Sequence, residues 1–150
     1  MREAARRGDL LALHEAAREL EDPDLRGPDV DAVHGAVGMA LIAEDGEEAA
    51  WALAGIVEAC GGCHASSQPP VRVGGPKPPH ASHGRAGEAM WSALLSDDGL
   101  AFSASVEDYL RLQPEHDVQR AHAARNASTR SERADAWGEL LVECQACHAL

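Results

Sequence analysis

A five-residue pattern, Cys-x-x-Cys-His, occurs twice in the chain, at 60–64 and at 144–148. Two thiols on one helical turn can each form a thioether bond to the edge of a porphyrin, so the pattern is typical of covalent haem attachment. The histidine that follows the second thiol then lies under the ring, where its imidazole can ligate the iron. The sequence therefore predicts two covalently attached haem c groups, held by Cys60, Cys63, His64, Cys144, Cys147 and His148.

The cysteine count favours haem over the other uses of such a motif. All four cysteines of the chain lie in the two copies, so no thiol is left over. Zinc bound by both Cys-x-x-Cys pairs would leave the histidine beside each pair without a role. A thioredoxin-like redox site would follow a strand, whereas here each copy ends a helical pattern. A zinc site and two structural disulfides stay open as the alternatives.

Each copy of the motif continues the apolar side of a predicted helix. Apolar residues recur at spacings of three and four before both copies, which is the period of one helix face. The corresponding residues are Leu53, Ile56 and Val57 in the first copy and Trp137, Leu140 and Leu141 in the second. We therefore expect a porphyrin inside a helical bundle, and two halves that are diverged repeats of a helix ending in a haem.

The rest of the sequence also favours helices. Asp9 is the predicted N-cap of the first helix, and the Thr-Arg-Ser-Glu sequence at 129–132 is a capping box for the last. The predicted helices cover about 9–21, 30–44, 47–64, 80–96, 100–112, 114–126 and 130–148. The fold class is therefore all-α, a helical bundle or bundles with two diverged haem-bearing halves, each ending in a helix that carries Cys-x-x-Cys-His.

A stretch rich in proline and glycine divides the two halves. Adjacent prolines and glycines in it cannot continue a helix and favour an extended linker. The sequence predicts a first haem-binding helical half at 1–65, a linker at 66–79, and a second haem-binding half of four helices at 80–150.

The formal net charge of −12 bears on the partners of the protein. It disfavours nucleic acid and anionic membrane surfaces, and it suits a basic redox partner as well as it suits solubility alone. No stretch is long and apolar enough to span a bilayer. No apolar signal region follows the first residues, yet covalent haem attachment normally takes place outside the cytoplasm. We therefore expect a periplasmic or otherwise extracytoplasmic protein whose signal peptide or anchor has been removed or lies upstream.

A helical bundle whose last helix carries Cys-x-x-Cys-His near its C-terminus resembles cytochrome c′ and the related four-helix c-type cytochromes. The resemblance covers the second half, where it implies that Cys144 and Cys147 hold a haem and that His148 ligates its iron. The first half departs from the four-helix pattern, because only three helices are predicted there. The whole chain is thus similar to a dihaem c-type cytochrome, and unlike the small cytochromes c whose motif lies near the start.

The sixth ligand of each iron decides whether small gases can bind. For the first haem we expect His34, on the apolar edge of the helix antiparallel to the haem helix. For the second we expect His83, because the first helix of a cytochrome c′-like bundle carries the distal residue. Met90 and His80 are the alternatives at the second haem. His34 and His83 are equally well explained as surface or core residues, and Met90 is more often core filler than an iron ligand.

Electron transfer between redox partners in the cell envelope is the predicted function, without enzymatic activity. Two haems in so short a chain should lie close enough for rapid exchange. The alternative is a gas-binding or sensing protein with an open haem. A peroxidase-like activity is disfavoured, because the sequence contains no clear acid–base constellation for it. Analogy with related bundles allows a homo-oligomer or a subunit of a larger redox assembly.

Overall fold

The computed structural model describes residues 1–66, 82–112 and 118–148, and every regular element within these ranges is an α-helix. In chain order the helices are α1 (Arg2–Arg7), α2 (Leu10–Glu19), α3 (Val30–Ile42), α4 (Gly46–Ser66), α5 (His83–Leu95), α6 (Gly99–Leu112), α7 (Val118–Asn126) and α8 (Arg130–His148). The predicted all-α class is therefore confirmed for the described part of the chain. Most of the predicted helix bounds agree with the observed ones to within a few residues.

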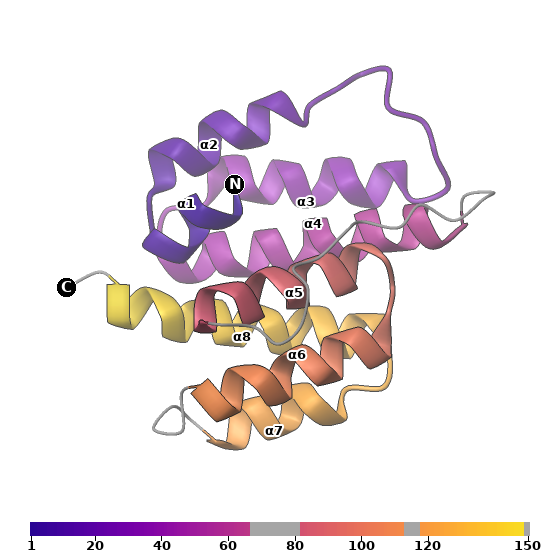
Figure 1. Ribbon diagram of the computed structural model, residues 1–150. Coiled ribbons are helices and arrows are strands. Elements are labelled where there is room, and N and C mark those ends of the chain that lie inside the picture. The colour runs from indigo at the N-terminus through magenta and orange to yellow at the C-terminus, as the bar shows by residue number, and fades with distance from the viewer. Residues whose placement is uncertain (67–81, 113–117, 149–150) are drawn as a thin grey trace.

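Helices α4 and α8, which carry the two motifs, lie side by side and run in opposite directions (Figure 1). Near the end of α8, Gln145 donates a hydrogen bond to the carbonyl of Gly46, the first residue of α4, at 2.7 Å. Further back along α8, a Cβ added to Gly138 would come within 3.2 Å of both Trp51 and Ala54. The missing side chain at Gly138 thus lets the two helices approach closely, and both contacts indicate the same antiparallel register.

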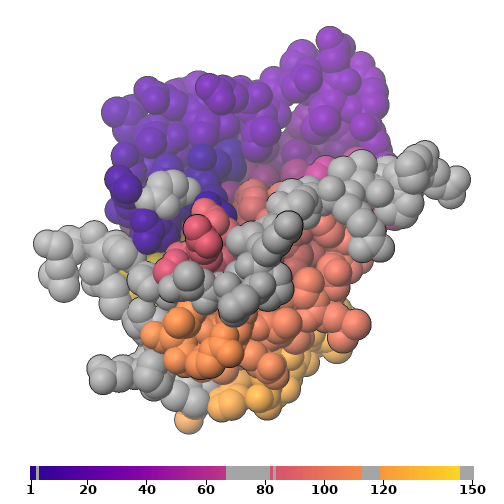
Figure 2. All heavy atoms as spheres, viewed as in Figure 1, coloured from indigo at the N-terminus to yellow at the C-terminus, as the bar shows by residue number. Residues whose placement is uncertain are grey.

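The other helices are arranged around this pair. Helices α2 and α3 lie along one side of α4, while α6 and α7 cover the far side of α5 and α8 (Figure 1). The main hydrophobic core contains buried residues from both halves, such as Leu13 and Leu53 from the first and Phe102 and Trp137 from the second. A smaller core joins α3 to α4. Figure 2 shows the indigo and purple N-terminal helices next to the red α5, which packs against α4.

The first half contains a helix that the sequence did not predict, so the expectation of only three helices there was wrong. Helix α1 has six residues, three of them arginine, and its only apolar residues are Ala4 and Ala5. So short a segment shows no helical period. Gly8 ends it in the left-handed conformation, with φ 64°, which glycine adopts without strain. The helix packs against both α4 and α8, and both alanines are buried in the main core.

Both predicted N-terminal caps are confirmed. The Asp9 carboxylate accepts a hydrogen bond from the Ala12 amide at 3.1 Å. At the start of α8, the Glu132 amide donates to the Thr129 hydroxyl at 3.2 Å, and the Thr129 amide donates to the Glu132 carboxylate at 3.0 Å. The predicted linker at 66–79 lies outside the described residues except for Ser66, and so do His80 and the start of the helix predicted at 114.

Candidate haem-binding sites

The first motif occupies the last turns of α4. Cys60, Cys63 and His64 are spaced three and four residues apart, which directs them to one side of the helix. A Cβ added to Gly61 would collide with the carbonyl oxygen of Leu94 at the end of α5, and one added to Gly62 with the guanidinium of Arg130. The two glycines between the cysteines therefore allow neighbouring helices to press against the back of the motif.

The imidazole of His64 is held in a defined orientation. Its Nδ1 donates a hydrogen bond to the carbonyl oxygen of Leu95 at 3.0 Å, since that oxygen can only accept. A neutral imidazole that carries its proton on Nδ1 has its lone pair on Nε2. Histidines that ligate metals commonly donate their other N–H to a carbonyl in this way. His64 is therefore oriented and protonated as a ligand that would bind through Nε2.

Cys60 lines a cavity of about 330 Å³ between α2, α4 and α5, called here the Cys60 cavity. Its walls are mainly apolar and include Leu20, Ile56 and Trp91. Burial raises the pKa of the Cys60 thiol, and the neighbouring Cys63 thiol raises it further. The side chain therefore stays neutral at neutral pH, in surroundings that suit the edge of an apolar ring.

Cys144, in the second motif, lines a larger cavity of about 460 Å³, called here the Cys144 cavity. Its apolar wall consists of Met90, Tyr109, Trp137, Leu140 and Leu141. Three arginines also line it: Arg2, Arg6 and Arg85. Arginine recognises carboxylates through paired hydrogen bonds. An apolar wall with arginines suits a flat apolar molecule that carries carboxylates, and haem has both properties.

The rest of the second motif is anchored by a side chain that reaches away from the helix. Gln145 is buried, and its amide nitrogen donates to the carbonyl of Ala5 in α1 at 2.5 Å and to that of Gly46 in α4 at 2.7 Å. Cys147 and His148 follow in the last turn of α8, but their side chains lie outside the described part of the structure. The end of α8 is thus fixed to both α1 and α4.

The two motifs lie at opposite ends of the antiparallel pair (Figure 1). The register places Cys144 level with Glu47, so at about 1.5 Å of rise per residue it lies about 20 Å from Cys60 along the helix axis. One zinc ion cannot bridge thiols so far apart, because its bonds to sulfur are about 2.3 Å long. Cys60 and Cys63 are free thiols, and no group of three or more ligands suited to a metal ion occurs among the described residues.

The predicted distal ligand of the first haem does not lie at the Cys60 cavity. The His34 side chain is exposed on α3, where it lines a separate hollow with Glu21, Asp22 and Pro23. The described residues that line this hollow include none from the first motif. Ligation of iron by His34 stays a prediction that this arrangement does not favour.

At the predicted second haem site, it is the start of α5, not its middle, that lies level with Cys144. The rings of Trp91 on α5 and Trp137 on α8 are in contact. Because these two helices are antiparallel, alignment at this contact puts Gly84 of α5 level with Cys144 of α8, and both residues line the Cys144 cavity. His83, whose side chain is not described, begins α5 at this level. Met90 lies about 9 Å further along the axis. Ligation by His83 stays a prediction, and the buried Met90 belongs to the apolar wall of the Cys144 cavity.

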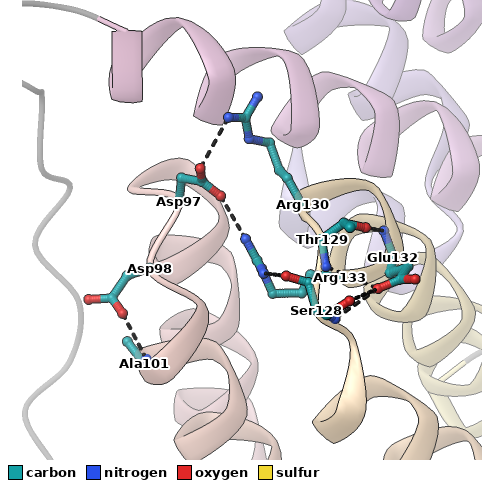
Figure 3. A network of polar contacts seen from close by, with 8 residues as sticks. All are labelled: Asp97, Asp98, Ala101, Ser128, Thr129, Arg130, Glu132 and Arg133. Atoms are coloured by element: carbon teal, nitrogen blue, oxygen red, sulfur yellow. Dashed lines mark hydrogen bonds and ion pairs between the residues drawn. The ribbon is translucent and has the colours of Figure 1, made fainter.

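An ion-pair network that the sequence did not reveal fastens the start of α8 to the turn after α5 (Figure 3). The Asp97 carboxylate accepts from Arg133 at 2.7 Å and from Arg130 at 3.1 Å. Burial alone would raise the pKa of Asp97, but the hydrogen bonds and charges of the two arginines outweigh it and lower the pKa. Asp97 has φ 49°, and the only signal for it in the sequence was an Asp-Asp-Gly turn. The network supports the end of α4, because Arg130 also touches Gly62.

Comparison with known proteins adds no relative to this description. The chain matches no protein-family model, no curated protein and no solved structure. Among the helices of the described ranges, none has the length and apolar character needed to cross a bilayer.

Proposed function

We propose that the protein is a dihaem c-type cytochrome that transfers electrons between redox partners in the cell envelope. The observation that carries the proposal is the duplicated Cys-x-x-Cys-His motif at the ends of two packed helices, with a thiol of each copy lining a cavity that has an apolar wall. A disulfide or a shared zinc site would require neither the two cavities nor the histidine of each motif.

In this proposal, each motif contributes two thioether bonds and one imidazole. Haem supplies the one-electron redox chemistry when it is bound. His64 approaches through Nε2, because the Leu95 carbonyl holds the proton on Nδ1. At the second site, Arg6 and Arg85 would pair with the carboxylates of the group, while Arg2 pairs with Glu88 at 3.0 Å. Trp137 and its apolar neighbours would exclude water from the ring.

The partners of this cytochrome are expected to be basic redox proteins. The net charge of −12 attracts such partners over a distance, and salt weakens the attraction. A periplasmic location, and membership of a homo-oligomer or a larger redox assembly, belong to the same proposal.

A second candidate function, the binding of a small gas, is favoured by one feature of the first site. The side chains that line the described walls of the Cys60 cavity include no histidine. A haem held there by the first motif would find no second histidine ligand on these walls. The first haem is thus the one at which a gas would bind.

The test is an intact mass together with absorption spectra of the oxidised and reduced protein, with and without carbon monoxide, after expression with haem-attachment machinery. We expect the mass of the chain plus two haems, and Cys60→Ala/Cys63→Ala or Cys144→Ala/Cys147→Ala should each remove one. A bare polypeptide without haem bands would refute the proposal. Two haems that ignore carbon monoxide support electron transfer, whereas a gas complex that is lost in the Cys60→Ala/Cys63→Ala variant supports gas binding at the first site.

A further inference from the structure

Two tryptophans connect the two cavities. Trp91 on α5 lines the Cys60 cavity, and Trp137 on α8 lines the Cys144 cavity. Their ring centroids lie 5.2 Å apart, with an angle of 44° between the ring planes. The chain has only five aromatic residues of the Phe, Tyr and Trp types, so two of them meeting at this place is a specific feature.

The pair also lies between the two motifs along the helix axes. Trp91 is one helical turn before Leu95, whose carbonyl holds His64 at the first motif. Trp137 is about two turns before Cys144, and so about 10 Å from it along α8. Because the motifs are about 20 Å apart, the two indoles fill the middle of the interval.

Ordinary packing explains part of this contact. Trp137 is 2% exposed and belongs to the main core, and tilted aromatic rings at this separation attract each other. Packing alone does not require each ring to reach a different cavity. A conjugated ring at the wall of each cavity, with the two rings in contact, forms a continuous aromatic route from one site to the other.

We propose that the Trp91–Trp137 pair is the electronic link between the two haem sites, an inference that depends on the function proposed above. In half-reduced protein the pair conducts one electron from the ferrous iron at one site to the ferric iron at the other. The first iron is oxidised and the second reduced, and neither indole is left oxidised. No proton moves and no bond changes. The electron originally enters from the external redox partner.

The test measures electron exchange in partly reduced, haem-loaded protein, from the exchange of haem methyl resonances in NMR spectra at several dilutions. Dilution separates exchange within one molecule from exchange between molecules. We expect Trp91→Leu to slow the internal exchange at least about tenfold, equivalent to about 1.4 kcal/mol of activation free energy. Trp91→Phe, which keeps a smaller ring, should fall between this variant and the native protein.

The matched control is Trp51→Leu. Trp51 packs between α4 and α8 beside Gly138, but it belongs to the described walls of neither cavity. Its replacement should leave the exchange rate unchanged. The midpoint potentials of all variants are measured alongside, so that a change of driving force is not mistaken for a change of route.

The two proposals fail in different ways. A native protein without two haems would refute the proposed function, whatever the tryptophans do. Two bound haems with an exchange rate that Trp91→Leu and Trp51→Leu affect equally would overturn the electronic link alone. If Trp91→Leu fails to retain both haems by mass, Trp91→Phe decides, and a native exchange rate in that variant overturns the link.

Discussion

The two motifs have the same five-residue pattern, but their surroundings hold them by opposite means. Between the cysteines of the first motif stand two glycines, and neighbouring groups press into the space that the missing side chains leave. In the second motif the corresponding position is Gln145, which reaches out to α1 and α4. The Cys-x-x-Cys-His pattern therefore fixes the residue types only at its cysteines and its histidine. The residues between them are free to take up the local packing.

The largest effect is expected where the first motif is most crowded. Gly61→Ala would bring a methyl group against the Leu94 carbonyl, which is backbone and cannot move cheaply. We expect a loss of about 1–3 kcal/mol in the free energy of unfolding, as for other overpacked sites. Chemical denaturation of the protein measures it.

Gly35→Ala on α3 is the control for this change. A Cβ at Gly35 meets nothing within 4 Å, so the better helix propensity of alanine should stabilise the protein by up to about 1 kcal/mol. Equal effects of the two substitutions would contradict the crowding at Gly61.

The second motif should respond to the loss of a side chain rather than to the gain of one. Gln145→Ala would remove the two hydrogen bonds that its amide donates to the carbonyls of Ala5 and Gly46, at a cost of about 1–3 kcal/mol. Denaturant unfolding would detect the change. Ser103→Ala, which removes an exposed hydrogen bond to the Arg125 carbonyl, should change stability by less than about 0.5 kcal/mol. A Gln145→Ala protein as stable as the Ser103→Ala control would show that the two buried hydrogen bonds contribute nothing.

A smaller, pH-dependent effect is expected from the network beside the first motif. The pKa of Asp97 is lowered in the folded protein, so its ion pairs add stability that is complete above its ordinary value of 3.8. This contribution disappears as the pH falls through the lowered value, because protonation removes the charge. Asp97→Asn should therefore be less stable than the native protein at neutral pH, and the difference should close in acid. The thermal midpoints of both proteins, measured from pH 7 to pH 2, test this. A difference between the two midpoints that stayed constant with pH would contradict it.

The smallest effect is expected at the exposed capping box that begins α8, the helix of the second motif. Hydrogen bonds from the amides of Thr129 and Ser128 and from the Ser128 hydroxyl lower the pKa of Glu132 from 4.5 to about 2. The stability that Glu132 contributes is thus complete above pH 4.5 and is lost between there and about pH 2. Glu132→Gln should flatten this part of the stability profile. Thermal midpoints measured between pH 5 and pH 2 check this. If they fell as steeply in the variant as in the native protein, the Glu132 cap would not contribute to the stability.

The sequence predicted what depends on local spacing. Apolar residues at helical intervals located seven of the eight described helices, and Asp9 and Thr129 marked two of their starts. Helix α1 was missed, because six residues with three arginines form no apolar stripe. The antiparallel register of α4 and α8 also escaped prediction. It depends on Gly138 and Gln145, whose partners lie many residues away.

The candidate sites divide in the same way. The cysteines and His64 followed from the motif, but the arginines of α1 at the Cys144 cavity could be found only once α1 itself was seen. His34 was expected from its helix face alone, and the structure shows that the loop after α2 lies on that side instead. The Asp97 network and the tryptophan contact join residues more than thirty positions apart, which no local pattern reveals.

The position of the two motifs at opposite ends of α4 and α8 has a kinetic consequence for the proposed electron carrier. A protein with a single exposed redox centre must release its donor before the acceptor can reach the same surface, which gives ping-pong kinetics. With one proposed haem at each end of the α4–α8 pair (Figure 1), donor and acceptor could be bound at the same moment. Steady-state rates measured against both partners should then give intersecting rather than parallel double-reciprocal lines.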